Sequence, residues 1–304
     1  MNLQEILAGI VPADEQARQA CQARFDRIGK PVGSLGRLET LLADIAAAGA
    51  TPEIDIGKKC VIVCCADNGV VARGVAQSTH EVTTTIARSL VRGTTSVSAM
   101  AKAVGADVFP VDLGMVDRVE GMIDRRIAAG TGDISAGPAM TRDQAEQAVL
   151  TGVELVRRRV REGYRLIASG EAGIGNTTTS SAVLAALLGL PAEAVTGRGS
   201  GLSDEGLERK KRIINRALAV NRPDPEDALD VLSRVGGFDL CAMTGLFLGG
   251  AAYHVPVILD GFISGTAALC AVRLCPAVRG YLLPSHQTAE PAGRLLMEPW
   301  EGGP

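Results

Sequence analysis

Short apolar runs rich in valine and isoleucine alternate with longer segments of helical periodicity along this chain, and this alternation limits most strongly what it can fold into. The runs that we expect as strands are Lys59–Ala66, Asp107–Asp112, Arg165–Ser169, Val255–Leu259 and Tyr281–Leu283. Near-continuous apolar strands separated by helices are typical of βαβ units, in which both faces of a parallel sheet are covered. The alternation therefore predicts an α/β fold around a parallel sheet.

The segments that we expect as helices carry apolar residues on one side, at a spacing of about 3.6 residues. They are Asp14–Ile28, Leu38–Ala48, Glu81–Ala103, Thr141–Glu162, Thr177–Leu188, Asp204–Ala219, Pro225–Val235, Asp239–Tyr253 and Gly265–Arg273. The first two precede the first strand and are expected to lie apart from the sheet. The longest apolar stretch, Cys241–Tyr253, is too short for the roughly 20 residues that span a bilayer, so we interpret it as a buried helix.

Charge and aromatic content argue against a protein that binds nucleic acid. The 304 residues include 31 Lys and Arg against 34 Asp and Glu, a net charge of −3, and 3% aromatic residues. Recognition of nucleic acid needs a basic surface, often with stacking rings. The first residues show no basic region before an apolar segment, so we expect no signal peptide. Because the longest apolar stretch is too short to span a bilayer, we also expect no membrane association.

The seven cysteines are odd in number, and several lie in the apolar runs. The close pair Cys64-Cys65 lacks the spacing of a metal site, and the three histidines lie elsewhere in the sequence. We therefore expect free thiols in a cytoplasmic protein, with no metal site and no cofactor.

Polar turns follow the expected strands, and ligands of open α/β sheets bind at the carboxyl ends of strands. The most informative turn contains Glu171, Gly173 and Gly175 and opens a helix at Asn176, Thr177 and Thr178. Glycines permit close approach to a ligand, and free N–H groups and hydroxyls at a helix start suit a phosphate. A structural cap is an equally good reading of such a turn by itself. The acidic Glu171 favours a functional site.

Three further segments fit the same interpretation. A loop with three glycines, Gly197–Gly201, precedes the helix that carries Lys210. Asp260 and Gly261 follow one apolar strand, and Ser285 and His286 follow the last. No Cys or Ser nucleophile pairs with a histidine in these turns. The set suits an enzyme that binds a phosphorylated sugar by positioning and electrostatics.

The motifs in these turns resemble those of one family, nicotinate mononucleotide:5,6-dimethylbenzimidazole phosphoribosyltransferase. The matching segments run in the family's order through nearly the whole chain. They are Lys30–Glu39, Ala66–Val70, Gly74-Val75, Glu81–Thr83, Gly170-Glu171, Gly173–Thr178, Gly197–Gly201, Leu259–Phe262 and Ser285-His286. No single motif is specific, but together they are.

The resemblance implies a Rossmann-like parallel sheet with helices on both faces and a small helical domain from the chain ends. The domains would be residues 1–50 with part of the C-terminus, a large domain over 51–290, and a C-terminal segment over 291–304. It also implies a dimer in which the partner helps to complete each site. In the implied reaction a nitrogen of an aromatic base attacks C1′ of nicotinate mononucleotide, nicotinate leaves, and inversion gives the α-ribotide of the cobamide lower ligand.

Matching motifs also imply site residues. Glu171 would be the acidic residue near the reacting centre, and Lys210 would approach the site. The phosphate and ribose would be bound by Gly173, Gly175, Asn176, Thr177, Thr178, Gly199, Asp260, Gly261 and Ser285. The loop from Asp67 to Thr85, including Gln77, would form the pocket for the aromatic base.

The sequence departs from the family at two places. Asn68 stands where a histidine is usual, Ala76–Thr79 replaces a Ser-x-Tyr-Pro-like run, and Thr85 replaces a glutamine. The family's terminal Gly-Glu-Gly segment, whose glutamate is taken as the general base, has no match before Pro304, and Glu298 does not fit it.

These departures leave three hypotheses. The chain could be an active phosphoribosyltransferase whose acceptor is a benzimidazole, a purine or a phenol. It could be a catalytically incomplete partner, in a heterodimer with a homologous chain, as in members of the family that act on phenols. A generic sugar-phosphate-binding protein is the third hypothesis. The sequence leaves a homodimer and a heterodimer equally open.

Overall fold

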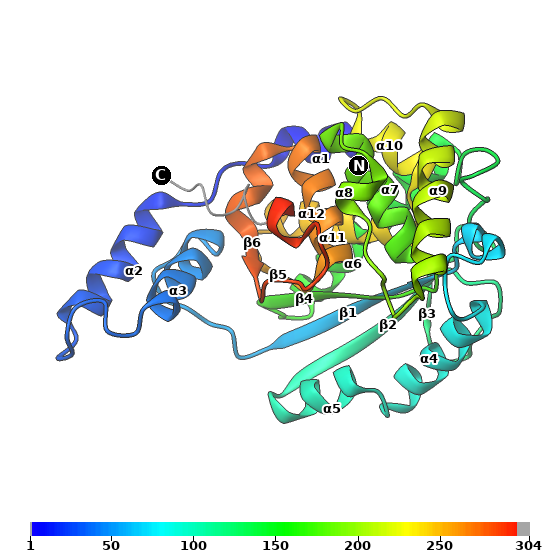
Figure 1. The fold of residues 1–304 in the computed structure, drawn as a ribbon. Helices are drawn as coiled ribbons and strands as arrows, with labels where there is room; N and C mark the ends of the chain where they lie inside the picture. Colours follow the sequence, from blue (N-terminus) through cyan, green and yellow to red (C-terminus); the bar gives the residue numbers. More distant parts are fainter. Residues whose placement is uncertain (1, 297–304) are drawn as a thin grey trace.

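The computed structural model describes residues 2–296 and places six parallel strands of this part of the chain in one sheet (Figure 1). The strands are β1 Lys59–Ala66, β2 Ala106–Gly114, β3 Ile123–Asp124, β4 Leu166–Ala172, β5 Val257–Leu259 and β6 Leu282–Pro284. Their order across the sheet is β3-β2-β1-β4-β5-β6, and every neighbouring pair is parallel. The predicted α/β fold with a Rossmann-like parallel sheet is confirmed.

Strand β1 lies at the centre of the sheet, because it pairs with β2 on one side and with β4 on the other. Lys59 lies opposite both Ala106 and Leu166. From β1 the chain moves outward to β2 and β3, then returns to β4 and moves outward in the opposite direction. The order therefore reverses between β1 and β4. The crevice at the carboxyl ends of such a pair is the usual ligand site of an open α/β sheet.

Helices cover the two faces of the sheet unequally (Figure 1). The thick layer contains α6 Arg142–Arg161, α7 Asn176–Leu188, α8 Ala192–Val195, α9 Asp204–Asn221, α10 Ala228–Val235, α11 Phe238–Ala252 and α12 Phe262–Leu274. The other face carries α4 His80–Arg92 and α5 Ser96–Ala103 below β1 and β2. Cys60, Ile62 and Cys64 of β1 enter the large core, whereas Val61 and Val63 point to the cluster beside α4.

Helix α11 is buried from Phe238 to Ala251, as expected for its apolar sequence. Where α11 crosses α6, glycines let the two backbones come into contact. A Cβ on Gly152 would lie 2.0 Å from Ala242 O, and one on Gly245 would lie 1.9 Å from Val149 O. No helix within residues 2–296 combines the length and the apolar character needed to cross a membrane.

The N-terminal helices separate into two groups. Helices α2 Glu15–Arg27 and α3 Arg37–Ala48 form a hairpin that projects from the body (Figure 1) and has its own small apolar cluster around Cys21, Ala43 and Ala46. Helix α1 Leu3–Gly9 instead packs into the large core. The domain boundaries at residues 50 and 290 stay predictions. Residues 297–304 of the C-terminal segment, Glu298 among them, lie outside the described residues.

Some elements differ from the expected ones. The single helix expected over Glu81–Ala103 is two, because Gly93 adopts φ +70° and ends α4, and the Thr95 side chain caps α5 by accepting from the Ser98 N–H. The apolar periodicity continues across this break, so the sequence pattern did not reveal it. Strand β3, helices α1 and α8, and the 3-10 helices η1 Gly69–Arg73 and η2 Pro276–Tyr281 were not expected, because they are too short to show a period.

Candidate active site

Two cavities open at the carboxyl ends of β4 and β5 and share one wall. Their volumes are about 200 Å³ and about 460 Å³. Both are lined by Gly170, Glu171 and Asp260. We call the smaller one the polar cavity and the larger one the apolar cavity, after their remaining residues. Molecules bound in the two cavities would therefore meet beside Glu171 and Asp260.

The first turn of α12 forms one side of the polar cavity. Gly261 is the N-cap, and Phe262, Ile263 and Ser264 line the cavity. The first N–H groups of a helix have no carbonyl partner within it and carry partial positive charge. This side therefore suits an anion.

A second group of donors lies at the far end of the polar cavity. Lys210 is 1% exposed, and its Nζ donates to Thr177 Oγ1 at 2.8 Å and to Gly197 O at 3.2 Å. Burial lowers the pKa of Lys210 to about 8, although the charge of Glu290 opposes that shift. Thr177 and Gly199 line the cavity, and a Cβ on Gly199 would lie 3.6 Å from Lys210 Nζ. The structure thus brings Thr177, Gly199 and Lys210 together, and their contact with a phosphate stays a prediction.

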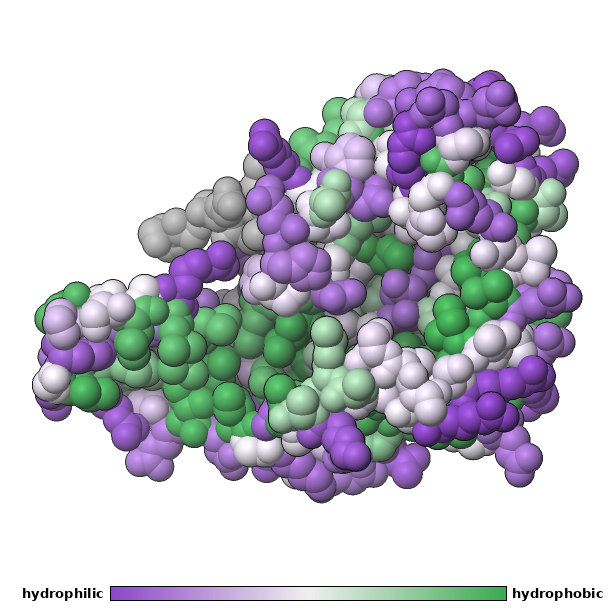
Figure 2. Space-filling view, turned by 60° about the horizontal axis from the view of Figure 1, so that its bottom comes forward, coloured by the Kyte–Doolittle hydropathy of each residue, from purple (hydrophilic) through white to green (hydrophobic). Residues whose placement is uncertain are grey.

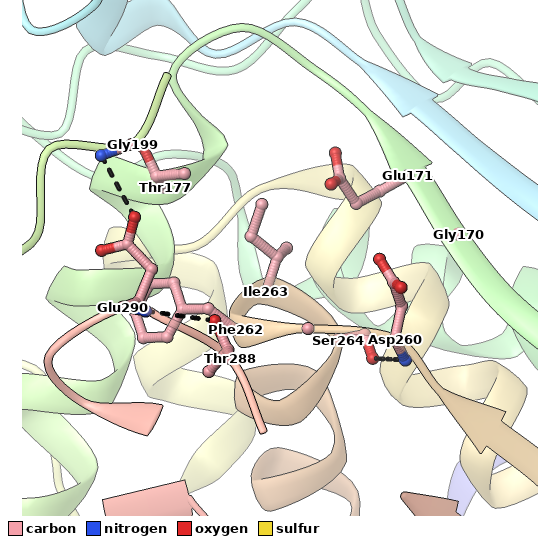
Figure 3. Close-up of a pocket in the computed structure, with 11 residues that line it drawn as sticks. Gly170, Glu171, Thr177, Gly199, Asp260, Phe262, Ile263, Ser264, Thr288 and Glu290 are labelled. Atoms are coloured by element: carbon pink, nitrogen blue, oxygen red, sulfur yellow. Dashed lines mark hydrogen bonds between the residues drawn. The ribbon is translucent and has the colours of Figure 1, made fainter. Parts of the chain in front are cut away.

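The carboxylate of Glu290 lies beside this second group of donors. Its Oε1 accepts a hydrogen bond from Gly199 N at 3.2 Å, and a Cβ on Gly197 would lie 1.6 Å from its Oε2. Figure 3 shows Glu290 and Thr177 at one end of the cavity and Glu171 and Asp260 at the other. One end of the cavity therefore carries hydrogen-bond donors and the Glu290 carboxylate, and the other end carries the carboxyl groups of Glu171 and Asp260.

Glu171 lies where the two cavities meet, and its carboxyl group is held by Asn176. Asn176 Nδ2 donates a hydrogen bond to Glu171 Oε2. Burial, and then the charges of Asp239 and Asp260, raise the pKa of Glu171 to about 7, while the Asn176 bond opposes the rise. A carboxyl group with a pKa near 7 can accept a proton efficiently at neutral pH.

Other residues of the turn after β4 face the protein interior. A Cβ on Gly173 would lie 2.4 Å from Ala66 O, and one on Gly175 would lie 2.6 Å from Val71 Cγ2. Thr178 is completely buried. These three residues do not line either cavity, so packing explains them, and their contact with a phosphate stays a prediction.

Aliphatic side chains from the sheet and from α4 and α5 line the apolar cavity. They are Val61, Val63, Ile86, Leu90, Val97, Met100, Ala168, Ala172, Ile258 and Leu259. Figure 2, which turns this face toward the viewer, shows apolar residues extending from the helical hairpin to the sheet. A cavity with apolar walls and few polar groups suits an aromatic ring.

The remaining predicted residues occupy different places. Ser285 lines the apolar cavity, and its hydroxyl donates to Asp260 O at 3.2 Å and lies 2.8 Å from His286 Nδ1. The side-chain amide of Gln77 donates to Gly201 O, and the Thr85 hydroxyl donates to Glu81 O at 2.9 Å within its own helix. Neither Gln77 nor Thr85 lines the two cavities, and their contact with an aromatic base stays a prediction.

Two acidic residues of this region, Glu290 and Asp239, were not among the predicted site residues. Glu290 follows the last strand and so carries the same signal as Glu171, a carboxylate in a turn after a strand. Asp239 begins an otherwise apolar helix and is completely buried. An acidic residue at the edge of an apolar segment is the sequence feature that could have identified Asp239.

The comparisons with known proteins agree with this geometry. A family model described as "Phosphoribosyltransferase" matches residues 10–302. The nicotinate-nucleotide–dimethylbenzimidazole phosphoribosyltransferase of Acetivibrio thermocellus is 47% identical over 91% of this chain and 80% of its own length, and that of Ruminiclostridium cellulolyticum is 43% identical over 100% and 87%. The crystal structure of CobT from Thermus thermophilus superposes with a TM-score of 0.89 at 39% identity, over 94% of this chain and 86% of that chain. The chain therefore belongs to the nicotinate-nucleotide–dimethylbenzimidazole phosphoribosyltransferase family.

Proposed function

We propose that this protein transfers the phosphoribosyl group of nicotinate mononucleotide to an aromatic base and so makes the α-ribotide of a cobamide lower ligand. One observation carries the proposal: a polar cavity with anion donors and an apolar cavity share the wall formed by Gly170, Glu171 and Asp260. A transferase needs two substrates whose reacting atoms meet, and the shared wall is the meeting point.

The nucleotide would lie along the polar cavity. Its phosphate would occupy the end with Gly199, Thr177 and Lys210, and its C1′ would lie toward Glu171 and Asp260. As nicotinate leaves, the ribose gains oxocarbenium character. Carboxylates at that end stabilise the developing positive charge.

The aromatic base would enter from the apolar cavity and attack C1′ on the face opposite nicotinate, which accounts for inversion. The attacking ring gains positive charge and must lose its N–H proton. Glu171, at the junction of the cavities, would take that proton, since its pKa of about 7 suits a general base at neutral pH. The nicotinate nitrogen is already cationic, so its departure needs little acid assistance.

Benzimidazoles, purines and phenols all remain candidate acceptors. The walls of the apolar cavity are mostly aliphatic, and the polar groups near its junction with the polar cavity include Glu171, Asp260 and Ser285. A flat apolar ring that carries one acidic N–H fits such a cavity better than a purine with several polar edges, because each buried polar group left unpaired costs about 1–3 kcal/mol. We therefore rank benzimidazoles above purines.

A dimer with a second copy is part of the proposal. Val32, Leu35 and Leu38 at the tip of the α2–α3 hairpin are 76%, 47% and 50% exposed, and Met100 at the rim of the apolar cavity is 72% exposed. Apolar side chains exposed on both a projecting hairpin and an open cavity are typical of an interface. Light scattering of the wild type and of Leu35→Glu tests this pairing, with a dimer expected for the first and a monomer for the second.

The names of the relatives support an active enzyme over a catalytically incomplete partner subunit.

Seven free cysteines, six of them buried, support the predicted cytoplasmic location, since such thiols persist in a reducing compartment.

The test is release of nicotinate from nicotinate mononucleotide by the purified chain, with benzimidazole, purine and phenol supplied separately. Dependence on an acceptor, with an α-ribotide as product, is the expected result. Glu171→Gln should lower kcat by about 10²–10⁴-fold while leaving the Kd of nicotinate mononucleotide within a few-fold. Absence of release with every acceptor, or full activity of Glu171→Gln, would contradict the proposal.

A further inference from the structure

A buried acid lies beneath Glu171 and takes no part in the chemistry described so far. Asp239, at the start of α11, is 0% exposed. Its Oδ1 accepts a hydrogen bond from Leu240 N at 2.9 Å, whereas its Oδ2 has no hydrogen-bond partner among the described residues. Burying a carboxylate with an unsatisfied oxygen is costly, so this position calls for an explanation.

Two glycines make room for this carboxyl group. A Cβ on Gly173 would lie 2.9 Å from Asp239 Oδ2, and one on Gly237 would lie 2.4 Å from Asp239 Oδ1. Gly173 lies two residues after Glu171, in the turn that follows β4. The acid is therefore packed directly behind the strand end that carries Glu171.

Asn176 connects the two acids. Its side-chain amide donates to Glu171 Oε2, and the same amide lies close enough to Asp239 to favour the charged form of that carboxyl. Asn176 itself is buried. Glu171, Asn176 and Asp239 thus form a row that runs from the cavity into the core.

We propose that Asp239 is a positioning residue for Glu171. Its carboxyl group, packed behind the Glu171–Asn176 pair, is coupled to that of Glu171 and sets its protonation. As a second part of the proposal, Asp239 thereby sets the pH range of the transfer. The second part of this inference rests on the function proposed above. The first part, the coupling of the two carboxyl groups, does not.

The charges around the pair agree with this role. The charge of Asp239 is the second cause, after burial, of the raised pKa of Glu171, and the charge of Asp260 adds to it. Burial raises the pKa of Asp239 to about 6, with a contribution from Asp67 and against the effects of Leu240 N–H and Asn176, so the group is mostly ionised above neutral pH.

The charges of Glu171 and Asp239 also act on the thiols of Cys64 and Cys65 on β1. Burial raises the pKa of both thiols, so they stay neutral and do not compete in this pH range. The coupling between the two carboxyl groups must act in both directions, because linkage between two sites is reciprocal.

The test is direct titration of Glu171 by ¹³C NMR on the full chain labelled at the side-chain carboxyl carbon of glutamate. The Glu171 resonance is assigned by its loss in Glu171→Gln. In the wild type its midpoint should lie near pH 7. In Asp239→Asn it should move to lower pH, by on the order of one pH unit, because a like charge has been removed.

Asp112→Asn is the matched control. Asp112 is also a buried acid at the carboxyl end of a strand, but its Oδ1 accepts from Gly114 N and Met115 N, and it is not among the groups that shift Glu171. This variant should leave the Glu171 midpoint unchanged. An unchanged midpoint in folded Asp239→Asn, or an equal shift in Asp112→Asn, overturns the proposal.

Two further measurements cover the cases in which Asp239→Asn is unfolded or the protein has another activity. With aspartate labelled, the wild-type Asp239 resonance should show a second shift near pH 7 as Glu171 ionises, and this second shift should be absent in Glu171→Gln. A second shift that is missing in the wild type, or that persists in Glu171→Gln, overturns the coupling. In kinetics, the acid limb of the kcat/KM profile should move with the Glu171 midpoint in Asp239→Asn, and a fixed limb overturns the second part. If no acceptor supports nicotinate release while the NMR shift occurs, the coupling stands and the proposed function fails.

Discussion

The carboxylate of Glu290 accepts a hydrogen bond from Gly199 N at 3.2 Å, and its charge acts on the buried ammonium group of Lys210. In the proposed complex the substrate phosphate uses the same donors, so the phosphate has to displace Glu290. Glu290→Gln removes the competing charge and should tighten binding of nicotinate mononucleotide by about 3–10-fold, an effect of about 1 kcal/mol. Calorimetry measures it, and weaker binding would show that Glu290 supports the nucleotide site.

Lys210 should take up a proton when the nucleotide binds. Its pKa in the free protein is lowered to about 8, and a phosphate beside it favours the charged form. At pH 8.5, binding enthalpies measured in buffers of different ionisation enthalpy should therefore reveal proton uptake by the protein. Lys210→Met should abolish the uptake and weaken binding. Lys211→Met is the control, because Lys211 pairs with Glu208 at the surface, and uptake that persists in Lys210→Met would assign the proton elsewhere.

Glu171→Gln should stabilise the protein at alkaline pH. The folded pKa of Glu171 is raised from 4.5 to about 7, so folding favours its protonated form. The free energy of unfolding of the wild type therefore falls relative to that of the variant as pH rises from about 4.5 to about 7. Above that range the wild type has lost the full contribution, about 1–3 kcal/mol.

Thermal melting at pH 8 should thus give a higher Tm for Glu171→Gln than for the wild type, and the difference should vanish at pH 4.5. Glu226→Gln, at an exposed position, should match the wild type at both pH values. A Glu171→Gln Tm at pH 8 equal to or below the wild-type value would mean that ionised Glu171 is well solvated.

Gly175→Ala should destabilise the fold. Gly175 has φ +92°, and an added Cβ would lie 2.6 Å from Val71 Cγ2. Backbone strain and overpacking together should cost about 2–4 kcal/mol in the free energy of unfolding. Gly189→Ala separates the two effects, because Gly189 has φ +62° with nothing near its Cβ position, and it should cost about 1 kcal/mol.

Denaturant unfolding measures both variants. The double variant Gly175→Ala with Val71→Ala should recover part of the loss, since it removes the contact and leaves the strain. Equal costs at positions 175 and 189 would show that the contact with Val71 contributes nothing.

The alternation of apolar runs and helical segments was sufficient to predict the class of fold and five strands of the sheet. Burial of both faces of a parallel strand leaves a continuous apolar run in the sequence, so these elements are encoded locally. Glu171 and Asp260 could be placed at ligand-facing strand ends for the same reason, because the carboxyl ends of parallel strands meet at one edge of the sheet.

Other features depended on contacts between distant segments. Glu290 reaches Gly199 across 91 positions of the chain, and Asp239 reaches the strand end of Glu171 from a helix whose sequence predicts only burial. Gly173 and Gly175 were predicted as phosphate-loop glycines, yet their surroundings are Ala66, Asp239 and Val71. The sequence by itself determined five strands of the sheet and the turns that could carry a site. Only the tertiary structure decided which side chains share a cavity, because that depends on how helices from separate parts of the chain pack over the strand ends, which no local periodicity records.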